Sequence, residues 1–348
     1  MKNKVIAIML VVALGSICLS GCGSEEKKLF EQANKDLEQG SYEYALQEYT
    51  ASIENKVKLP ESYRGAGIAE FRMGNYAEAA EYFTNALNCE KVGKILRHDL
   101  LKFRASAEYN LENYESAMAD CQTIAAEYEM DADDYYLTGK TALALDAYDE
   151  AGVNFEQAYV NDATYDMAIQ IYQAYIERNM EADGTKYLET ALLTEAKSAD
   201  DYCDRGLVYY YMEDYDNASQ ELIKASDAGS IEASFYLGMV YFAKNDSSNA
   251  RAMYQTYIDQ GGSAAKGYNG LAMCNMAEKN YEAALENISA GIVTATTEEL
   301  QNLLFNEVVI YEEQLDFQTA LSKAEEYLRI YPDDKVMQKE LTFLKTRI

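Results

Sequence analysis

A pair of small residues recurs about every 34 residues along most of this 348-residue chain. In most copies a glycine or alanine is followed, twelve positions later, by an alanine. The second members of the pairs are Ala45, Ala79, Ala117, Ala151, Gly184, Ala218, Ala250, Ala284 and Ala320. A period of this length is typical of stacked-repeat proteins, in which each unit buries its apolar face against the next. The sequence therefore predicts one elongated domain of nine units.

Each unit contains two apolar-periodic stretches of about 14 residues, joined by a short polar turn such as residues 73–76. This pattern predicts a pair of antiparallel α-helices. The small residue lies midway along the first helix and the alanine early in the second, so the two backbones can approach closely where they cross. A tyrosine three positions before the alanine is expected to pack over this crossing. Tyr172 and Val308 replace the small residue in the fifth and ninth units, which are the degenerate ones.

These residues resemble the tetratricopeptide repeats, which are helix-turn-helix units. The clearest unit carries Tyr63, Gly67, Asn75, Tyr76, Ala79, Phe83 and Ala86. The resemblance implies an all-α, right-handed superhelical α-solenoid of about nine repeats over residues 29–334. The sequence departs from the family at Ser234, where an aromatic residue is usual, and its repeat-closing proline remains only as Pro332. Residues 335–348 carry apolar side chains at helical spacing and predict a C-terminal capping helix.

The N-terminus has the features of an export signal. Lys2 and Lys4 precede an apolar run over residues 5–19, which ends in small residues before Cys22. The sequence Leu-Ser-Gly-Cys at residues 19–22 resembles the bacterial lipobox, in which the cysteine receives a lipid. The resemblance implies a lipoprotein signal peptide at residues 1–21, and a lipidated Cys22 with a polar tether over residues 22–28. The alternative is an ordinary signal peptide with a coincidental cysteine.

The charge of the chain restricts its partners. Asp and Glu number 59 against 30 Lys and Arg, which gives a formal net charge of −29. Such a charge repels nucleic acids and anionic lipid headgroups. We therefore expect no nucleic-acid partner, and contact with the membrane only through a lipid on Cys22. The expected location is the extracytoplasmic face of the cell membrane.

The sequence offers little chemistry for catalysis. Cys89, Cys121, Cys203 and Cys274 are expected to be free thiols, because stacked repeats hold such positions too far apart for disulfides. No Cys-x-x-Cys motif, Cys/His cluster or glycine-rich phosphate loop is present. His98, the only histidine, is expected to lie on the surface. We therefore predict no enzyme activity, no cofactor and no metal.

The resemblance implies that the first helices line an inner, concave groove. In the N-terminal units the expected lining residues are Phe30, Asn34, Arg64, Ile68, Phe71, Arg72, Lys102, Ser106, Tyr109, Tyr136 and Lys140. In the C-terminal units they are Leu207, Tyr210, Tyr211, Phe235, Met239, Phe242, Asn269, Met273 and Met276. The first set carries four cations, whereas the second is aromatic and methionine-rich, as in adaptable interaction surfaces. The alternative is that some of these residues pack against the next repeat. The Lys/Asn clamp with which some family members hold a chaperone's C-terminal carboxylate is not reproduced.

Together these features predict an exported, lipid-anchored scaffold that binds a protein or peptide of the cell envelope in its groove. One alternative is an assembly factor of a secretion, pilus or outer-membrane machine. Another is an accessory protein that binds cell-wall glycan through some of its 31 tyrosines, although the chain has no tryptophan. The sequence leaves the identity of the partner open.

Overall fold

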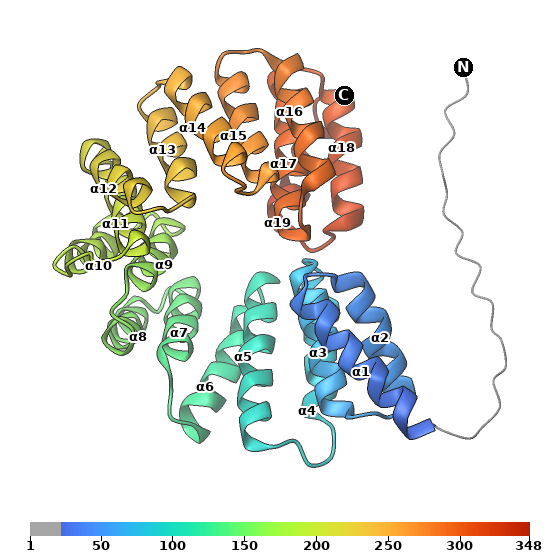
Figure 1. The fold of residues 1–348 in the computed structure, drawn as a ribbon. Helices are drawn as coiled ribbons and strands as arrows, with labels where there is room; N and C mark the ends of the chain where they lie inside the picture. Colours follow the sequence, from blue (N-terminus) through green and yellow to red (C-terminus); the bar gives the residue numbers. More distant parts are fainter. Residues whose placement is uncertain (1–21) are drawn as a thin grey trace, which may run out of the picture.

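The computed structural model of the chain describes residues 22–348, which form nineteen α-helices and no strand. The predicted signal peptide, residues 1–21, lies outside the described residues. Eighteen helices pair in chain order into nine hairpins, and the last helix packs against the ninth hairpin (Figure 1). The prediction of an all-α solenoid with a C-terminal capping helix is confirmed.

The first helices of the hairpins are α1 (Cys22–Glu38), α3 (Leu59–Arg72), α5 (Lys94–Asn110), α7 (Ala132–Ala144), α9 (Tyr165–Ile176), α11 (Ala199–Tyr211), α13 (Glu232–Ala243), α15 (Ala264–Ala277) and α17 (Thr297–Glu313). The second helices are α2 (Tyr42–Glu54), α4 (Tyr76–Leu87), α6 (Tyr114–Glu127), α8 (Tyr148–Asn161), α10 (Glu181–Ala191), α12 (Tyr215–Asp227), α14 (Ser247–Asp259), α16 (Tyr281–Thr294) and α18 (Phe317–Ile330). The capping helix is α19 (Lys335–Leu344).

The first hairpin begins earlier than the sequence suggested. We expected residues 22–28 to form a polar tether before the first repeat, but in the structure they are the first turns of α1. Glutamate and lysine, which occupy residues 25–28, are good helix formers, and acidic residues are favourable at a helix N-terminus. The segment therefore continues the helix of the first repeat instead of separating from it.

The close approach within each hairpin depends on the small residue of the first helix. A methyl group on Gly67 would lie 2.6 Å from the ring of Phe83, and one on Gly139 would lie 2.8 Å from the ring of Phe155. Each glycine therefore lies against the large side chain one turn after the repeat alanine, and not against the alanine itself. A larger residue at the glycine position would force the two helices apart.

In the fifth hairpin the two helices approach equally closely, but the large and small residues have exchanged helices. Tyr172 occupies the position of the small residue in α9, and Gly184 replaces the alanine in α10. A methyl group on Gly184 would lie 3.0 Å from the Cα atom of Tyr172. This unit, degenerate in sequence, therefore keeps a close helix crossing because its glycine lies on the opposite helix.

The tyrosine that begins many second helices packs at the hairpin turn. The ring of Tyr76 lies 5.2 Å from that of Phe71, and Tyr114 lies at the same distance from Tyr109. The packing role predicted for this position is confirmed in these units. Tyr148 differs, because 49% of its surface stays exposed.

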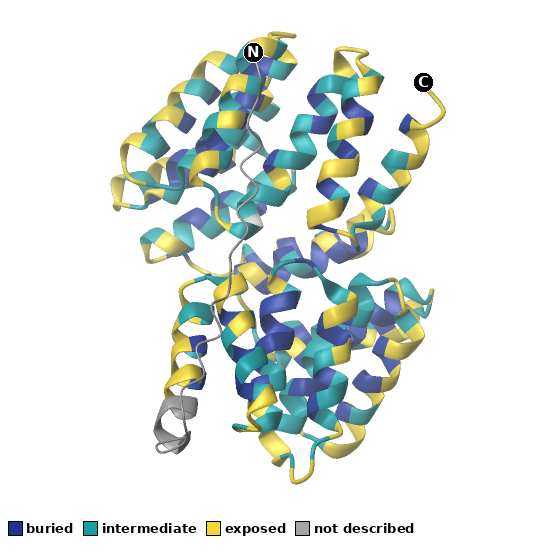
Figure 2. Cartoon of the chain, turned by 90° about the vertical axis from the view of Figure 1, so that its right-hand side faces the viewer, coloured by how far each residue is buried: buried dark blue, intermediate teal, exposed yellow. Residues whose placement is uncertain are grey.

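Consecutive first helices contact one another along the array; for example, α3 contacts α5, and α5 contacts α7. The second helices pack instead on their hairpin partners and on the next first helix. The first helices therefore line the inner side of the curve (Figure 1). Buried residues are concentrated where helices face one another, while exposed residues follow the outer edges and turns (Figure 2).

The array curves until its C-terminal end meets the second and third hairpins (Figure 1). The backbone N–H of Ala77, in the first turn of α4, donates to the Asp333 carboxylate at 2.8 Å. The Lys339 ammonium lies 3.5 Å from the Glu112 carboxylate. Tyr331 packs against the turn at Gly74, whose φ of +80° suits glycine. We call these three pairs the closure contact.

The cysteines with described side chains, Cys89, Cys121, Cys203 and Cys274, are free thiols. All but Cys89 are buried, and burial raises the pKa of Cys121 to about 11. None of the helices in residues 22–348 is long and apolar enough to cross a membrane.

Candidate functional site

Four cavities follow one another along the inner face, with volumes of about 730, 490, 310 and 620 Å³. The first lies between α1, α3 and α5, and the second between α3, α5 and α7. The third lies between the N-terminal hairpins and the closure contact, and the fourth between α9 and α11. Neighbouring cavities share lining residues, namely Asp99, then Tyr109, Asn110 and Lys140, then Glu177. We call this row of cavities the inner track.

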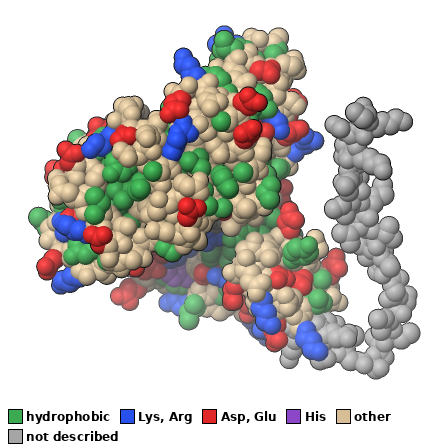
Figure 3. Space-filling model, turned by 45° about the horizontal axis from the view of Figure 1, so that its top comes forward, with side chains coloured by type: hydrophobic (Ala, Val, Ile, Leu, Met, Phe, Trp, Pro, Cys, Tyr) green, Lys and Arg blue, Asp and Glu red, His purple; other side chains and the backbone are tan. Residues whose placement is uncertain are grey.

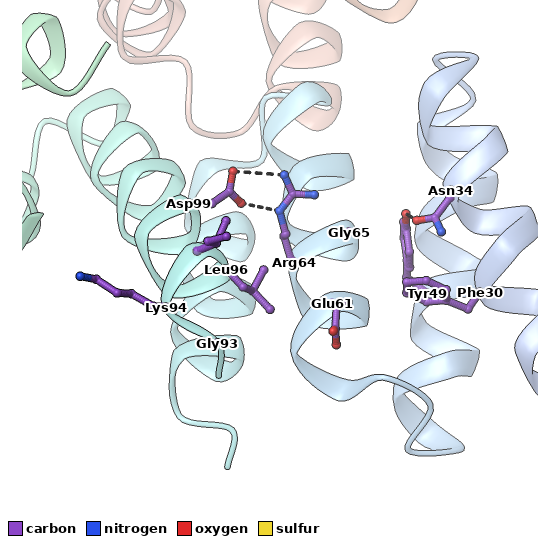
Figure 4. A pocket seen from close by; sticks show the side chains of 11 residues that line it. Phe30, Asn34, Tyr49, Glu61, Arg64, Gly65, Gly93, Lys94, Leu96 and Asp99 are labelled. Carbon is purple, nitrogen blue, oxygen red and sulfur yellow. Dashed lines mark hydrogen bonds and ion pairs between the residues drawn. The ribbon is translucent and has the colours of Figure 1, made fainter. Parts of the chain in front are cut away.

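The first cavity has an apolar floor with polar groups at its edges (Figure 4). Phe30 and Tyr49 pack edge to face at 5.9 Å, and the Tyr49 hydroxyl donates to Asn34 at 2.6 Å. Ile95, at the start of α5, also lines the cavity and is 89% exposed. An apolar side chain of a bound segment could therefore be buried between the floor and this exposed residue.

Two of the cations that the sequence placed in the groove are neutralised within the chain. The Arg64 guanidinium forms a bidentate ion pair with Asp99 (Figure 4). The Lys102 ammonium lies 3.0 Å from Asp131 and 3.6 Å from Asp134. Burial lowers the pKa of Lys102, but the surrounding carboxylates outweigh this effect, so its pKa is raised. Arg64 and Lys102 thus join neighbouring repeats. The expectation that they are available groove charges is corrected.

Lys140 is in a different situation. It lines the second and third cavities, and its ammonium lies 4.3 Å from the centre of the Tyr109 ring. Among the described residues, no carboxylate forms an ion pair with it. Burial lowers the pKa of Lys140, and the charge of Glu177 only partly opposes this. Lys140 therefore supplies a cation to the track, and the main partner of this cation is the Tyr109 ring.

The other predicted N-terminal residues lie at or near the track. Phe71, Ser106 and Tyr136 line the second cavity, whereas Ile68 is buried in the repeat core. Arg72 is exposed on the last turn of α3. Charged side chains are interspersed with hydrophobic ones, both around the first cavity (Figure 4) and on the molecular surface (Figure 3).

The C-terminal set divides into track residues and packing residues. Tyr210 and Tyr211 line the fourth cavity. The ring of Phe235 instead lies 5.7 Å from Tyr254 and 5.3 Å from Tyr257, both on α14. Phe235 therefore packs on the second helix of its own hairpin but stays half-buried, so its groove position stays a prediction.

The remaining C-terminal residues follow the same division. Met239 and Phe242 pack against the buried cluster that contains Ala250, Tyr254 and Cys274. Leu207 packs against the core around α7–α10, and Met276 packs against the core of α15–α17. Asn269 accepts a hydrogen bond from Asn306. Met273 is 39% exposed. All of these side chains are half-buried or exposed, so the aromatic and methionine surface predicted for this half stays a prediction, of which Tyr210 and Tyr211 line a cavity.

His98 is half-buried, with 21% of its side chain exposed. Its Nε2 lies 2.8 Å from the buried Asp134 carboxylate, and its ring stacks on Tyr128 at 4.6 Å. Asp134 itself closes a capping box with Asp131 at the start of α7. His98 therefore lies at the edge of the surface, where it connects α5 to α7.

Sequence reasoning also missed the carboxylates of the track. Asp99 and Asp133 each stand three positions before a predicted lining residue, Lys102 and Tyr136 respectively. That spacing places both members on one helical face, so it could have been used to find them. The described residues contain no group of three or more His, Cys, Asp and Glu side chains arranged to hold a metal ion.

Comparison with known proteins gave one family model and several solved structures. The family model described as tetratricopeptide repeat matches residues 30–90, 203–265 and 237–292. A crystal structure of a tetratricopeptide repeat protein from Parabacteroides merdae ATCC 43184 is 18% identical, with 72% of this chain and 99% of that chain covered and a TM-score of 0.47. A monomeric IFIT1 mutant with Gppp-AAAA is 16% identical, with 91% and 80% covered and a TM-score of 0.46. No curated protein sequence matches the chain. Residues 30–90 and 203–292 therefore match tetratricopeptide repeats, and the described chain as a whole is an all-α solenoid.

Proposed function

We propose that this protein is an exported, lipid-anchored scaffold that holds an extended segment of another cell-envelope protein along the inner track. The observation that carries the proposal is the series of four cavities that share lining residues. A compact ligand needs one enclosed pocket. A row of open cavities suits a chain that presents side chains at intervals.

The polar residues of the track suit a polypeptide. Asn34, Asn110 and Gln301 each line a cavity. Each carries an amide that can both donate and accept a hydrogen bond, as the peptide backbone does. With aromatic rings between them, such amides can bind the backbone while the apolar parts of the cavities select side chains.

The export and lipid parts of the proposal rest on the sequence around Cys22. Because α1 begins at Cys22, a lipid on that residue would hold the first repeat close to the membrane. Cys22→Ala is expected to abolish metabolic labelling with palmitate and to leave the precursor uncleaved. Equal labelling of the variant and the parent would contradict the lipid anchor without bearing on the track.

Site-specific crosslinking tests the track itself. The photo-crosslinking amino acid p-benzoylphenylalanine would replace Ile95 in the first cavity or Ile176 in the fourth, in cells of the native host. The matched control is Val293, an apolar residue on α16 that is 84% exposed. We expect both track positions to crosslink to the same envelope protein and the control to give no such product. Equal products from all three positions, or none from the track, would overturn the proposal.

A further inference from the structure

The fourth cavity is built almost wholly from tyrosine rings and carboxylates. Tyr172 of α9, Tyr210 and Tyr211 of α11, and Tyr215 of α12 line it together with Glu177 and Glu213. Both carboxylates are exposed. The cavity therefore offers several aromatic faces and a negative charge.

Hydrogen bonds and ring contacts hold the tyrosines in place. The Tyr172 hydroxyl donates to the Tyr211 backbone carbonyl at 3.1 Å, and the Gln173 amide donates to the Tyr211 hydroxyl at 2.7 Å. The Tyr211 ring lies 5.9 Å from that of Tyr172 and 5.5 Å from that of Tyr210. The rings are thus ordered before any ligand binds, which reduces the entropy lost on binding.

Elsewhere on the inner face the chain places its own cations on its aromatic rings. Lys58 lies 4.5 Å from the centre of the Phe30 ring, Arg64 lies 5.4 Å from that of Phe103, and Lys140 lies 4.3 Å from that of Tyr109. In the part of the chain that the structure describes, no lysine or arginine lies over a ring of the fourth cavity, and none lines it. In this cavity, four tyrosine rings that line one space lack the cationic member of that pairing.

We propose that the fourth cavity binds a cationic side chain, arginine or lysine, of the segment held in the inner track. The inference rests on the proposed function, since it names one side chain of that segment. A guanidinium or ammonium group attracts the faces of tyrosine rings, and Glu177 and Glu213 supply opposite charge at the edge. The net charge of −29 also steers a basic segment toward the protein. An anionic side chain would meet two carboxylates and no cation.

A pair of small probes tests the site independently of any partner. Nα-acetylarginine methylamide carries the guanidinium, and Nα-acetylcitrulline methylamide has nearly the same shape without the charge. Both would be titrated into the full chain labelled with ¹³C-tyrosine, and the ring signals would be assigned through single Tyr→Phe variants. We expect saturable shifts of Tyr172, Tyr210, Tyr211 and Tyr215 with the arginine probe, and none with the citrulline probe at equal concentration.

Charge-removing variants complete the test. Glu177→Gln combined with Glu213→Gln keeps the size of both side chains, and we expect it to weaken arginine-probe binding about tenfold. The matched control combines Glu189→Gln and Glu282→Gln, which change exposed glutamates on the second helices α10 and α16. Equal binding of both probes, shifts confined to other tyrosines, or unchanged affinity in the first variant would overturn the inference.

The outcomes separate this inference from the proposed function. If crosslinking at Ile95 and Ile176 succeeds but the arginine probe does not bind, the track holds a segment and the fourth cavity does not select a cation. If the probe binds and crosslinking fails at both positions, the cation site stands and the scaffold proposal fails.

Discussion

The second and fourth cavities lie on the same inner face, yet the chain treats their charges in opposite ways. In the second, Lys102 is neutralised by Asp131 and Asp134, and Lys140 lies over Tyr109. In the fourth, no lysine or arginine of residues 22–348 lines the cavity or lies over its tyrosine rings. A cation read from the sequence of a repeat protein is therefore available to a ligand only if the next repeat does not already bind it. The four predictions below test this contrast, beginning with the largest effect.

The carboxylate network of the second cavity is expected to be structural. Asp134 is fully buried, accepts from His98, and caps α7. Asp134→Ala should destabilise the chain by about 2–3 kcal/mol, since it leaves His98 and Lys102 without a buried partner and removes a cap. The matched control is Asp133→Ala, whose side chain is 76% exposed and should cost no more than about 0.5 kcal/mol. Equal shifts of the urea midpoint would show that the network contributes little.

Two lysines on the same face should respond in opposite directions. Lys102→Met should lower stability by about 1 kcal/mol, whereas Lys140→Met should leave it unchanged or raise it by a similar amount. The raised pKa of Lys102 means that its stabilisation is complete below the unfolded-state pKa and is lost as pH rises through the folded-state pKa. The lowered pKa of Lys140 means that its charged form costs stability at neutral pH; this cost begins to fall as pH rises past the folded-state pKa and is gone above the unfolded-state pKa.

Thermal melts of both lysine variants between pH 7 and 11 would check these signs. If both substitutions destabilise to the same extent, the contrast between a paired and an unpaired lysine is wrong.

Thiol reactivity can show whether the N-terminal and C-terminal halves of the chain both protect their buried cysteines in the folded state. Cys121 lies in the N-terminal half, Cys203 and Cys274 lie in the C-terminal half, and all three are buried. In a chain without residues 1–21 and with Cys22→Ala, we expect only Cys89 to react rapidly under native conditions. All four thiols should react after denaturation without reductant. Mass spectrometry of the labelled peptides would identify each site, and a missing pair after denaturation would point to a disulfide.

The smallest effect is expected at the closure contact, which joins the C-terminal end of the array to the second and third hairpins. Asp333→Ala with Lys339→Ala removes a hydrogen bond and an exposed ion pair, so the melting temperature should change by only about 1–2 °C. The distance between fluorophores at Glu78 and Val336 should nevertheless broaden, because the two ends are no longer joined. Lys345→Ala, on the exposed C-terminal residues, is the control. An unchanged distance distribution would mean that Tyr331 and Gly74 suffice to hold the ends together.

The repeat period predicted the hairpins and their number, and the helical spacing of apolar residues after Pro332 predicted the capping helix, because each depends on contacts within one or two units. The inner-face ion pairs were not predicted. Arg64 and Asp99 are 35 residues apart, and their meeting depends on the rotation between adjacent repeats. The closure contact is harder still to predict from the sequence, because Ala77 and Asp333 are 256 residues apart and small rotations accumulate over the units between them.

The division of the C-terminal set has a more local cause. Helical spacing placed Phe235 and Tyr210 on equivalent faces of their helices, and it could not distinguish their surroundings. What decides between them is the neighbouring second helix: α14 offers Tyr254 and Tyr257 to Phe235, whereas Tyr210 meets Tyr215 at the turn and stays beside the fourth cavity. The period of a repeat specifies a position, but the neighbouring second helix decides which contacts the residue at that position makes.

The closure contact makes the solenoid a split ring. A segment in the third cavity has hairpins two and three on one side and the C-terminal end on the other. It can leave by sliding lengthwise along the track or by waiting until the ends separate. Its residence time then depends on the opening rate of the ring as well as on its own contacts, so weak closure can tune dissociation while leaving each cavity unchanged.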